Sequence, residues 1–270
     1  MVATDKVFSG SIPEIYDRLF VPLIFAPYAA DLAARIAKTR PRDVLETAAG
    51  TGALTAAMVS RLPAESRIVA TDLNQPMLDY ASAKPPLRDR VTWQQADAQA
   101  LPFDDATFDV VTCQFGMMFL PDKVKGYSEA LRVLKPSGRF IFSVWDRIAD
   151  NYFADVVTNA LATLFPKDPP LFMARTPHGY HDVARIREDV SAGGFRNISI
   201  ETVDHTSKAR SARDVAVAYC QGSPLRNEIV ARDAARLEEA TSVAAAALEK
   251  RFGSGAIEGL IRAHVIVAGG

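Results

Sequence analysis

Cysteine and histidine are scarce in this sequence, with two and four residues among 270. Two cysteines, Cys113 and Cys220, are too few for a disulfide framework or a zinc-finger pattern. We expect both to be free thiols in a reducing compartment. His178 and His181 lie close together in the chain, but no carboxylate or cysteine pattern supports a metal site there, so none is expected.

Excess charge and long apolar runs are also missing. The formal net charge is -1, with 31 basic and 32 acidic residues, so the balance gives no basic footprint for a nucleic-acid partner. No run of 18 or more apolar residues predicts a membrane span. The first 20 residues do not resemble a signal peptide, which has a basic segment followed by an apolar core. These absences predict a cytoplasmic protein, and they leave its oligomeric state open.

Strand-like and helical segments alternate along the first half of the chain. The strand-like runs are 43–48, 67–72, 91–96, 108–115 and 138–145. Several are apolar on both faces, as central parallel strands are. The pattern predicts an α/β fold with a doubly wound, Rossmann-like sheet. Runs at 198–204 and at the C-terminal end extend it to seven strands, mostly parallel, with an antiparallel terminal strand.

The remaining segments predict a single domain, 1–270, with helical additions to the sheet. The expected core comprises 36–146, 183–207 and 256–270, and the expected lid comprises 1–35, 147–182 and 208–255. The lid segment 147–182 is proline-rich and reads as a loop with one helix at 151–164. The region 211–252 is mostly helical, with a break at 222–224. It carries one apolar stripe, formed by Val230, Ala234, Leu237, Thr241, Ala244 and Leu248.

The stretch "VLETAAGTGALT", residues 44–55, holds the first functional signal. A strand ends on Glu46, small residues follow, and a helix begins. Ligands bind at the carboxyl ends of strands in such sheets, and glycine lets the backbone approach them closely. Nicotinamide cofactors use G-x-G-x-x-G in this place. Gly50-x-Gly52 does not continue into that pattern.

The stretch resembles motif I of class I S-adenosylmethionine-dependent methyltransferases, [DE]-x-G-x-G-x-G. Here the motif is Glu46-x-Ala48-x-Gly50-x-Gly52, with Ala48 in place of the first glycine. The resemblance implies S-adenosylmethionine as cofactor and S-adenosylhomocysteine as product. It also implies that the turn passes beneath the methionine part of the cofactor and that Glu46 acts near its ammonium group, often through water.

Three further motifs follow at the next strand ends, and the resemblance covers residues 40–145. It implies that Asp72 binds the ribose hydroxyls, a role an acid here could play for either cofactor. It places Leu73, Asp97 and Ala98 around the adenine. In the stretch "EALRVLKPSGRFIFS" the family's helix-turn-strand signature recurs with Ser137 in place of a glycine.

The fourth strand and the N-terminal segment supply the remaining candidates. Gln114, Phe115 and, less directly, Met118 correspond to residues that line the methyl-transfer site in the family. Phe8 and Tyr16 are candidates for contact with the methionine end of the cofactor. Each candidate also has a purely structural interpretation. The glycines suit any turn, the acids suit helix caps, and the aromatic side chains suit a core.

The methyl acceptor is less well indicated. The [DNS]-P-P-[YFW] motif of enzymes that methylate amino groups of nucleic acids is replaced by Gln114-Phe115-Gly116-Met117. Cys113 lies inside an apolar strand, which favours a buried thiol over a nucleophile. In "TPHGYHD", three side chains could serve as a general base, namely His178, Tyr180 and His181. The structural alternative is an exposed or capping histidine.

We therefore expect methyl transfer from S-adenosylmethionine to a small, apolar or aromatic molecule. The reaction would be an in-line displacement, in which the protein mainly positions the reactants. The expectation of an apolar acceptor rests on the lid residues Phe20, Phe25, Phe153, Leu171, Phe172 and Met173. Two alternatives remain at this point: a nicotinamide-dependent oxidoreductase and a non-catalytic module that binds the cofactor and a protein partner.

Overall fold

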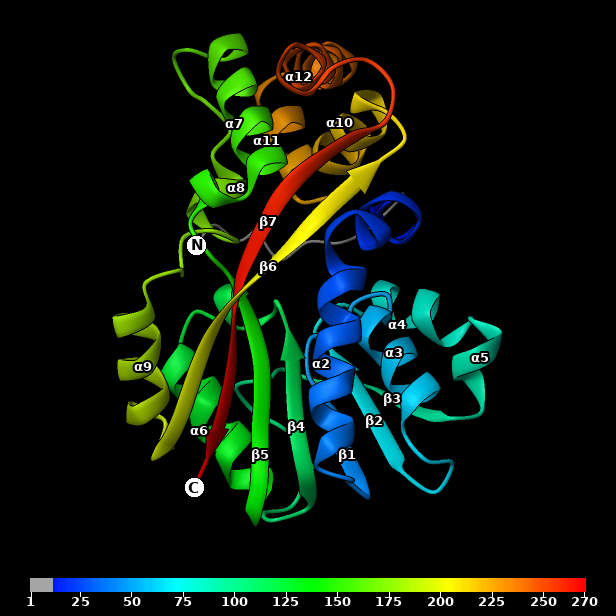
Figure 1. Ribbon diagram of the computed structural model, residues 1–270, viewed down its shortest axis with the longest axis vertical. Coiled ribbons are helices and arrows are strands. Elements are labelled where there is room, and N and C mark those ends of the chain that lie inside the picture. Colours follow the sequence, from blue (N-terminus) through cyan, green and yellow to red (C-terminus); the bar gives the residue numbers. More distant parts are fainter. Residues whose placement is uncertain (1–11) are drawn as a thin grey trace.

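The computed structural model describes residues 12–270 and shows a sheet flanked by helices, with a helical region above the carboxyl ends of the parallel strands (Figure 1). The strands are β1 (Asp43–Glu46), β2 (Arg67–Asp72), β3 (Val91–Gln95), β4 (Phe108–Gln114), β5 (Leu134–Trp145), β6 (Asn197–Ala209) and β7 (Ile257–Gly269). The α-helices are α1 (Ile12–Ile15), α2 (Ala26–Lys38), α3 (Ala53–Arg61), α4 (Gln75–Ser82), α5 (Pro85–Arg88), α6 (Lys123–Val133), α7 (Tyr152–Leu164), α8 (Phe172–Arg175), α9 (Val183–Ala192), α10 (Ala212–Gln221), α11 (Leu225–Arg232) and α12 (Leu237–Phe252). A π-helix, η2 (Tyr16–Phe25), and short 3-10 turns, η3 (Met117–Phe119), η4 (Ile148–Asp150) and η5 (Ala234–Arg236), complete the set.

The seven strands have the order β3-β2-β1-β4-β5-β7-β6. β1 to β5 are parallel, and β7 runs antiparallel between β5 and β6. The predicted seven-stranded, mostly parallel sheet with an antiparallel terminal strand is therefore confirmed. Chain order reverses between β1 and β4, so the carboxyl ends of these two strands form the switch point at which such sheets bind ligands.

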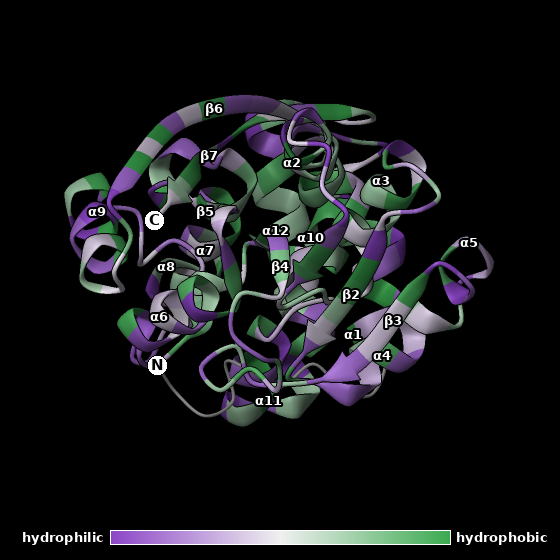
Figure 2. Cartoon of the chain, turned by 90° about the horizontal axis from the view of Figure 1, so that it is seen from below, coloured by the Kyte–Doolittle hydropathy of each residue, from purple (hydrophilic) through white to green (hydrophobic). Residues whose placement is uncertain are grey.

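Side chains alternate between the two faces of the sheet, as the pleat requires. Val44 packs in a cluster with Leu32 of α2 and Met58 of α3. Its neighbour Leu45 packs in the other cluster, which contains Tyr127 of α6. Viewed from below, the apolar residues of β2 and β4 lie in the interior between the helices (Figure 2). Both faces of the central strands are thus covered, which explains their continuous apolar sequence.

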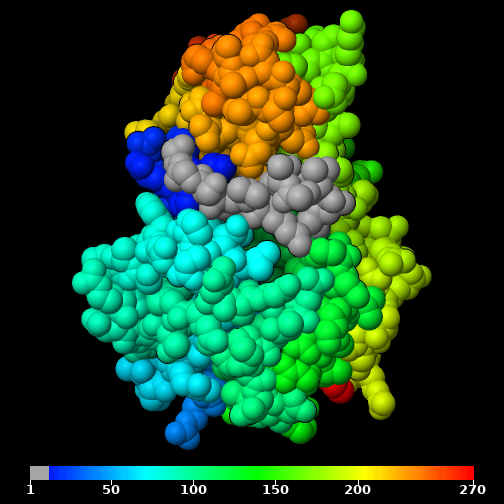
Figure 3. Space-filling model, turned by 180° about the vertical axis from the view of Figure 1, so that it is seen from behind, coloured from blue at the N-terminus to red at the C-terminus, as the bar shows by residue number. Residues whose placement is uncertain are grey.

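The helices α7, α8, α10, α11 and α12 form a separate layer above the carboxyl ends of the parallel strands, which we call the lid (Figures 1 and 3). The β6–β7 ribbon reaches up to it. β5 pairs with β7 as far as Trp145↔Ala263, whereas β6 and β7 stay paired up to Ala209↔Ile257. The sixth strand is therefore longer than the predicted run 198–204, because it follows β7 beyond the point at which β7 leaves β5.

The predicted lid segments differ from the structure in detail. The segment 147–182 holds α7 close to the expected range and also α8. The single stripe predicted for 230–248 is wrong at its beginning. α11 ends at Arg232, and Asp233 caps the next turn by accepting from the Ala235 amide. Val230 is 37% exposed, whereas its neighbour Ile229 is buried in the same cluster as the α12 part of the stripe, so α11 meets the core with a different face from the one predicted.

The N-terminal part of the described chain is a continuous helical run of α1, η2 and α2. The π-helical turn surrounds Pro22, and the Ala26 amide donates to the Val21 carbonyl five residues back. By length and composition the run from Ile12 to Lys38 could cross a membrane, with a mean hydropathy of 1.5 over its most apolar window. Half of that window is buried inside the protein, as in a core helix. Phe8 lies outside the described residues.

Candidate functional site

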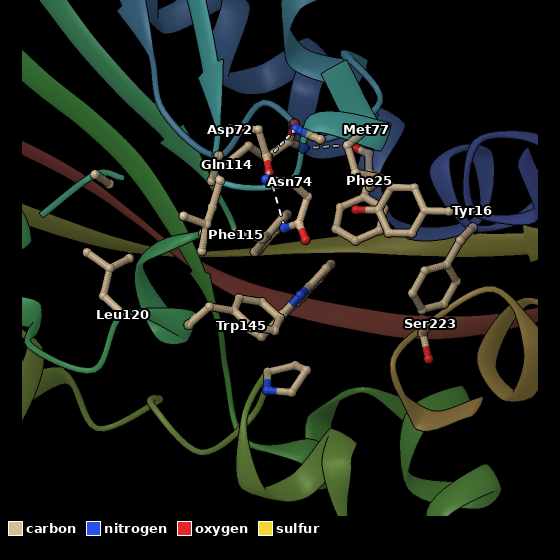
Figure 4. A pocket seen from close by; sticks show the side chains of 18 of the residues that line it. Tyr16, Phe25, Asp72, Asn74, Met77, Gln114, Phe115, Leu120, Trp145 and Ser223 are labelled. Atoms are coloured by element: carbon tan, nitrogen blue, oxygen red, sulfur yellow. Dashed lines mark hydrogen bonds between the residues drawn. The ribbon is translucent and has the colours of Figure 1, made fainter. Parts of the chain in front are cut away.

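A cavity lies between the carboxyl ends of the parallel strands and the lid (Figure 4). About 1060 Å³ of its space holds no protein atoms, and part of that space is open to solvent. The side chains around it come from strand ends, η2 and the lid: Tyr16, Phe20, Ile24, Phe25, Ala48, Gly50, Asp72, Leu73, Asn74, Met77, Ala96, Asp97, Ala98, Gln99, Gln114, Phe115, Gly116, Phe119, Leu120, Pro121, Trp145, Phe172, Met173, Pro177 and Ser223.

The turn after β1 forms one wall of the cavity. Its backbone is fixed on both sides, because the Thr47 amide donates to Thr112 O of β4 and the Ala49 amide to Thr71 O of β2, each at 2.9 Å. Gly50 and Ala48 both have positive φ, 56° and 53°. An alanine in this region carries a backbone strain of about 1 kcal/mol. Gly116, after β4, packs against this turn. A side chain is excluded there, because a Cβ on Gly116 would lie 2.4 Å from the Ala48 Cβ.

Asp72, the last residue of β2, faces the cavity with a buried carboxylate. Its Oδ2 accepts from the Gly50 amide at 2.9 Å, and its Oδ1 accepts from the Asn74 amide at 2.8 Å. Burial raises the pKa of Asp72, and these donors act in the opposite direction. The carboxylate is therefore held in one orientation and joins the ends of β1 and β2.

Glu46 and Gly52, both predicted to bind the cofactor, do not line the cavity. Glu46 is 1% exposed, and its Oε2 accepts from Thr55 Oγ1 at 2.6 Å. Burial raises the pKa of Glu46 to about 8, and the nearby Asp72 acts in the same direction. Gly52 begins α3 with φ 83°, and a Cβ there would lie 3.2 Å from the Trp93 ring. Glu46 lies beneath the turn, and Gly52 allows the turn to pack.

The other predicted cofactor residues do line the cavity. They are Tyr16, Ala48, Gly50, Asp72, Leu73, Asp97, Ala98, Gln114 and Phe115. Leu73 is 45% exposed at the rim. Asp97 accepts from the Gln99 amide at 2.9 Å, so it also has the turn-capping role considered as its structural alternative. Gln114 donates from Nε2 to the Phe25 carbonyl at 2.8 Å, which ties β4 to η2. Met118 is buried but does not line the cavity.

Aromatic rings form the wall near the ends of β4 and β5. Phe115 and Trp145 stack with ring centroids 3.7 Å apart and planes 3° apart. Phe25 packs edge-on against both rings, at 5.7 Å from Phe115 and 5.9 Å from Trp145. Phe115 has φ 56°, a strained conformation that turns its ring back over the end of β4. Strain of this kind tends to accumulate at functional sites.

The three candidates for a general base do not line the cavity. Tyr180 donates to Asp189 Oδ2 at 2.9 Å and lies 3.3 Å from the Tyr127 hydroxyl, in a buried network between α6 and α9. His178 is buried, with Nδ1 2.7 Å from Asp146 O, and burial lowers its pKa to about 4. His181 Nδ1 lies 2.8 Å from the His178 carbonyl. The expectation that these side chains face the transferred methyl is not supported by this arrangement.

Both cysteines are buried and free. Burial raises the pKa of the Cys113 thiol to about 11, which leaves it protonated and unsuited to nucleophilic attack at neutral pH.

Sequence reasoning missed several lining residues. From the strand ends these are Asn74, Met77, Gln99 and Trp145, and from the lid they are Pro177 and Ser223. Trp145 could have been found, since it is the last residue of a predicted strand and strand-end position had identified Gln114 and Phe115. Pro177 lies in the proline-rich segment 147–182 that was expected in the lid, but nothing marked the residue itself, and Ser223 had no signal, because only the tertiary packing of the lid brings it to the cavity.

Comparison with known proteins identifies the family. Residues 45–142 match the family model described as methyltransferase domain. A ubiquinone/menaquinone biosynthesis C-methyltransferase of Idiomarina loihiensis is 33% identical over 178 residues, which cover 61% of this chain and 70% of that protein. A demethylmenaquinone methyltransferase of Lactiplantibacillus plantarum is 33% identical over 148 residues, covering 54% and 61%.

Solved structures share the fold. A putative methyltransferase from Bacillus halodurans superposes with a TM-score of 0.57 at 18% identity, covering 88% of this chain and 97% of that one. The [4+2]-cyclase SpnF superposes with a TM-score of 0.57 at 17% identity, covering 90% and 81%. Because a cyclase shares the fold, the fold by itself does not define the reaction.

The site fits the cofactor of the family. A small-residue turn, a fixed carboxylate at the end of β2 and an apolar rim at Leu73 and Ala98 lie together around one cavity. This donor set suits an amino acid, a ribose and a purine, and no phosphate cradle is present among the described lining residues. The sequence relatives, the family model and this site together show that the chain belongs to the class I S-adenosylmethionine-dependent methyltransferases, is an enzyme and uses S-adenosylmethionine.

Proposed function

We propose that the enzyme methylates a small, apolar or aromatic molecule by in-line displacement. The observation that carries this proposal is the composition of the cavity wall. Among its described residues, the titratable side chains are Tyr16, Asp72 and Asp97, and both acids lie on the β2–β3 side. The wall near β4, β5 and the lid is formed mainly by Phe115, Phe119, Leu120, Trp145, Phe172 and Met173. A charged acceptor would lose its hydration there without gaining an ionic partner.

The residues of the chain mainly bind and orient. Bound S-adenosylmethionine supplies a methyl group already activated on a sulfonium. Asp72 would accept from the ribose hydroxyls, and the turn at Ala48 and Gly50 would place backbone against the methionine part. The stacked rings of Phe115 and Trp145 limit where the acceptor can lie. Such positioning supplies a large part of the rate of a displacement reaction.

Near β4, β5 and the lid, the described cavity wall has no carboxylate or imidazole that could take a proton from the methyl acceptor. Burial raises the pKa of Tyr16 well above its ordinary value, and His178 lies outside the wall. An acceptor that needs no strong base, such as an electron-rich ring carbon, a thiol or a neutral amine, fits this arrangement. Two relatives named as quinone-pathway methyltransferases favour an aromatic ring among these.

The test is methyl transfer from S-adenosylmethionine labelled in its methyl group. Hydroxylated benzenes and naphthalenes form one set of acceptors, and glycine, histamine and transfer RNA form the other. We expect label in members of the aromatic set only, with S-adenosylhomocysteine released in equal amount. Transfer to the charged set, with none to the rings, would contradict the proposed acceptor class.

A further inference from the structure

Among the strand-end residues that line the cavity, Trp145 is the farthest in strand order from the residues that follow β2 and β3. It is the last residue of β5 and lies beyond β4 from the turn after β1. The residues expected to bind ribose and adenine follow β2 and β3, on the other side of that turn. Trp145 is only 3% exposed, yet it lines the cavity. It therefore belongs to the wall that an acceptor would meet.

The indole of Trp145 is held rigidly by other rings. Phe115 covers one face at 3.7 Å. Tyr28 meets the ring at 5.3 Å with planes 89° apart, and the Tyr28 hydroxyl is itself anchored, donating to the Val203 and Ile261 carbonyls. Figure 4 shows Trp145 beside Phe115 in the cavity. A group on this indole would have one fixed direction.

The indole N–H of Trp145 has no hydrogen-bond partner among residues 12–270. Trp145 Nε1 is also not fully enclosed. The fully enclosed polar side-chain atoms that lack a partner in that range are Thr51 Oγ1, Trp93 Nε1, Ser143 Oγ, Thr158 Oγ1 and His205 Nε2. Trp145 itself lines the cavity, so the cavity is the adjoining space from which a ligand oxygen could reach this N–H. Buried polar groups are nearly always hydrogen-bonded, so this donor indicates a ligand or water oxygen.

Other donors on this side of the cavity are already bonded. Gln114 Nε2 donates to the Phe25 carbonyl at 2.8 Å, and Ser223 Oγ donates to the Tyr219 carbonyl at 2.7 Å. The Trp145 N–H thus stands as an unused donor in a wall that is mainly aromatic among the described residues. An acceptor that matches it has a flat apolar ring and an oxygen at the ring edge.

We propose that Trp145 determines specificity by donating its Nε1–H to a carbonyl or hydroxyl oxygen carried by an aromatic acceptor. This inference rests on the proposed function and narrows it, from apolar or aromatic molecules in general to oxygen-substituted rings. The hydrogen bond would also fix the ring about one axis, and the stacked pair would fix its depth. An unsubstituted ring of the same size would bind without that orientation.

The chain offers a matched control in its second tryptophan. Trp93 Nε1 also lacks a partner, but it is fully enclosed, and Trp93 does not line the cavity. Trp145→Phe and Trp93→Phe therefore make the same chemical change, and only the first removes a donor that a ligand can reach. Both retain an aromatic ring, which limits the loss of packing.

The experiment is calorimetric titration of the full chain, saturated with S-adenosylhomocysteine, with 1-tetralone and with tetralin, which lacks the carbonyl oxygen. We expect Trp145→Phe to weaken 1-tetralone binding about 3- to 10-fold more than tetralin binding, the effect of one hydrogen bond, because the smaller ring reduces the apolar contact with both probes alike. Trp93→Phe should bind both probes as the wild type does. Affinity for S-adenosylhomocysteine should be unchanged in both variants, which also shows that they are folded.

Three outcomes overturn the proposal. Equal loss for both probes in Trp145→Phe would assign Trp145 to packing alone. If the wild type and Trp145→Phe bind 1-tetralone equally well, Trp145 does not determine specificity. Binding of tetralin in that case would still support the proposed function. Binding of neither probe to a wild type that binds S-adenosylhomocysteine would contradict both this inference and the proposed acceptor class.

Discussion

On the β1–β3 side of the cavity, polar groups are fixed by backbone. Asp72 is held by the Gly50 and Asn74 amides, and the turn before it is held by β2 and β4. On the β4–β5 side, the wall is made of side chains that come from separate layers: Phe115 and Trp145 from the sheet, and Phe172 and Met173 from the lid. Few of the groups on this second side are polar.

This difference matches two kinds of recognition. A ligand with fixed polar groups needs donors and acceptors at fixed places, and strand ends provide these. An acceptor that varies between related enzymes needs a wall that can change without disturbing the sheet. Lid side chains provide such a wall, because substitutions there leave the strand ends unchanged.

The largest expected effect is the loss of Asp72. Asp72→Ala should weaken S-adenosylhomocysteine binding by about 2–4 kcal/mol, because bonds from two ribose hydroxyls to a charged acceptor are lost. Calorimetry measures this, with Asp97→Ala as a control from the more exposed end of β3 and a smaller expected loss. Unchanged affinity in a folded Asp72 variant would show that the carboxylate only joins the two turns.

Glu46 should make stability depend on pH. Its folded pKa, about 8, lies above the ordinary value of 4.5. At a pH between these two values, Glu46 holds a proton in the native state that it has lost in the unfolded state. The free energy of unfolding therefore falls as pH rises, by about 1.36 kcal/mol per pH unit. Denaturant titrations from pH 5 to 8 without ligand should show this fall in the wild type and lose it in Glu46→Gln.

Glu129 provides the contrast for that experiment. Arg132 holds the pKa of Glu129 at about 2, so its contribution is present above its ordinary pKa and is lost only in acid. Glu129→Gln should therefore lower stability by an amount that stays constant from pH 5 to 8. An identical pH trend in wild type and Glu46→Gln would show that Glu46 titrates normally.

Tyr180→Phe separates a structural from a catalytic role in the segment 147–182. The variant loses the hydroxyl that donates to Asp189, and the buried carboxylate loses a partner. We expect the free energy of unfolding to fall by about 1–3 kcal/mol, with turnover per folded molecule unchanged. Thermal unfolding and methyl-transfer rates measure the two quantities. A large loss of turnover with an unchanged free energy of unfolding would indicate that Tyr180 has a catalytic role.

The smallest expected effect concerns an attachment of η2 beside the cavity. Lys84 Nζ bonds Asp17 of η2 and donates to the Thr51 carbonyl, beside the β1 turn, at 2.7 Å. Lys84→Met should change stability by less than about 1 kcal/mol, since the pair is partly exposed. We expect S-adenosylhomocysteine to dissociate a few-fold faster in stopped-flow measurements.

The control for Lys84 is Arg213→Met, which breaks an ion pair with Glu238 inside the lid. It should leave the dissociation rate unchanged. Equal rates in all three proteins would mean that η2 does not need to move when the ligand leaves.

The polar side of the site was largely predictable from the sequence, and the apolar side was predictable in part, since Phe115, Phe172 and Met173 were named as candidates and Trp145 was not. Gly50, Asp72 and Asp97 follow strands that the pattern identified, and parallel topology brings strand ends together wherever the helices lie. Glu46 follows the same rule in sequence, but its side chain turns beneath the loop toward Thr55. The strand pattern predicts where a strand ends, but it does not predict which way the side chain of its last residue points.

Pro177 and Ser223 reach the cavity because of the way the lid helices pack against one another. No periodic pattern in the sequence predicts that packing. The predicted base, His178, does not line the cavity, for a related reason. Its neighbour Pro177 lines the cavity, and one residue later the chain has turned the imidazole toward the Asp146 carbonyl. Proximity in sequence to a wall residue therefore did not imply access to the wall.

The position of β7 has a consequence for how the chain is made. β7 is the last strand in sequence, yet it lies between β5 and β6. Until Ile257–Gly269 leaves the ribosome, β5 has an open edge and β6 has no strand partner at all. Open edges of this kind invite pairing with other chains, and distant pairings form slowly. The nascent protein should therefore be most prone to aggregate after β5 and β6 have been made and before β7 has left the ribosome.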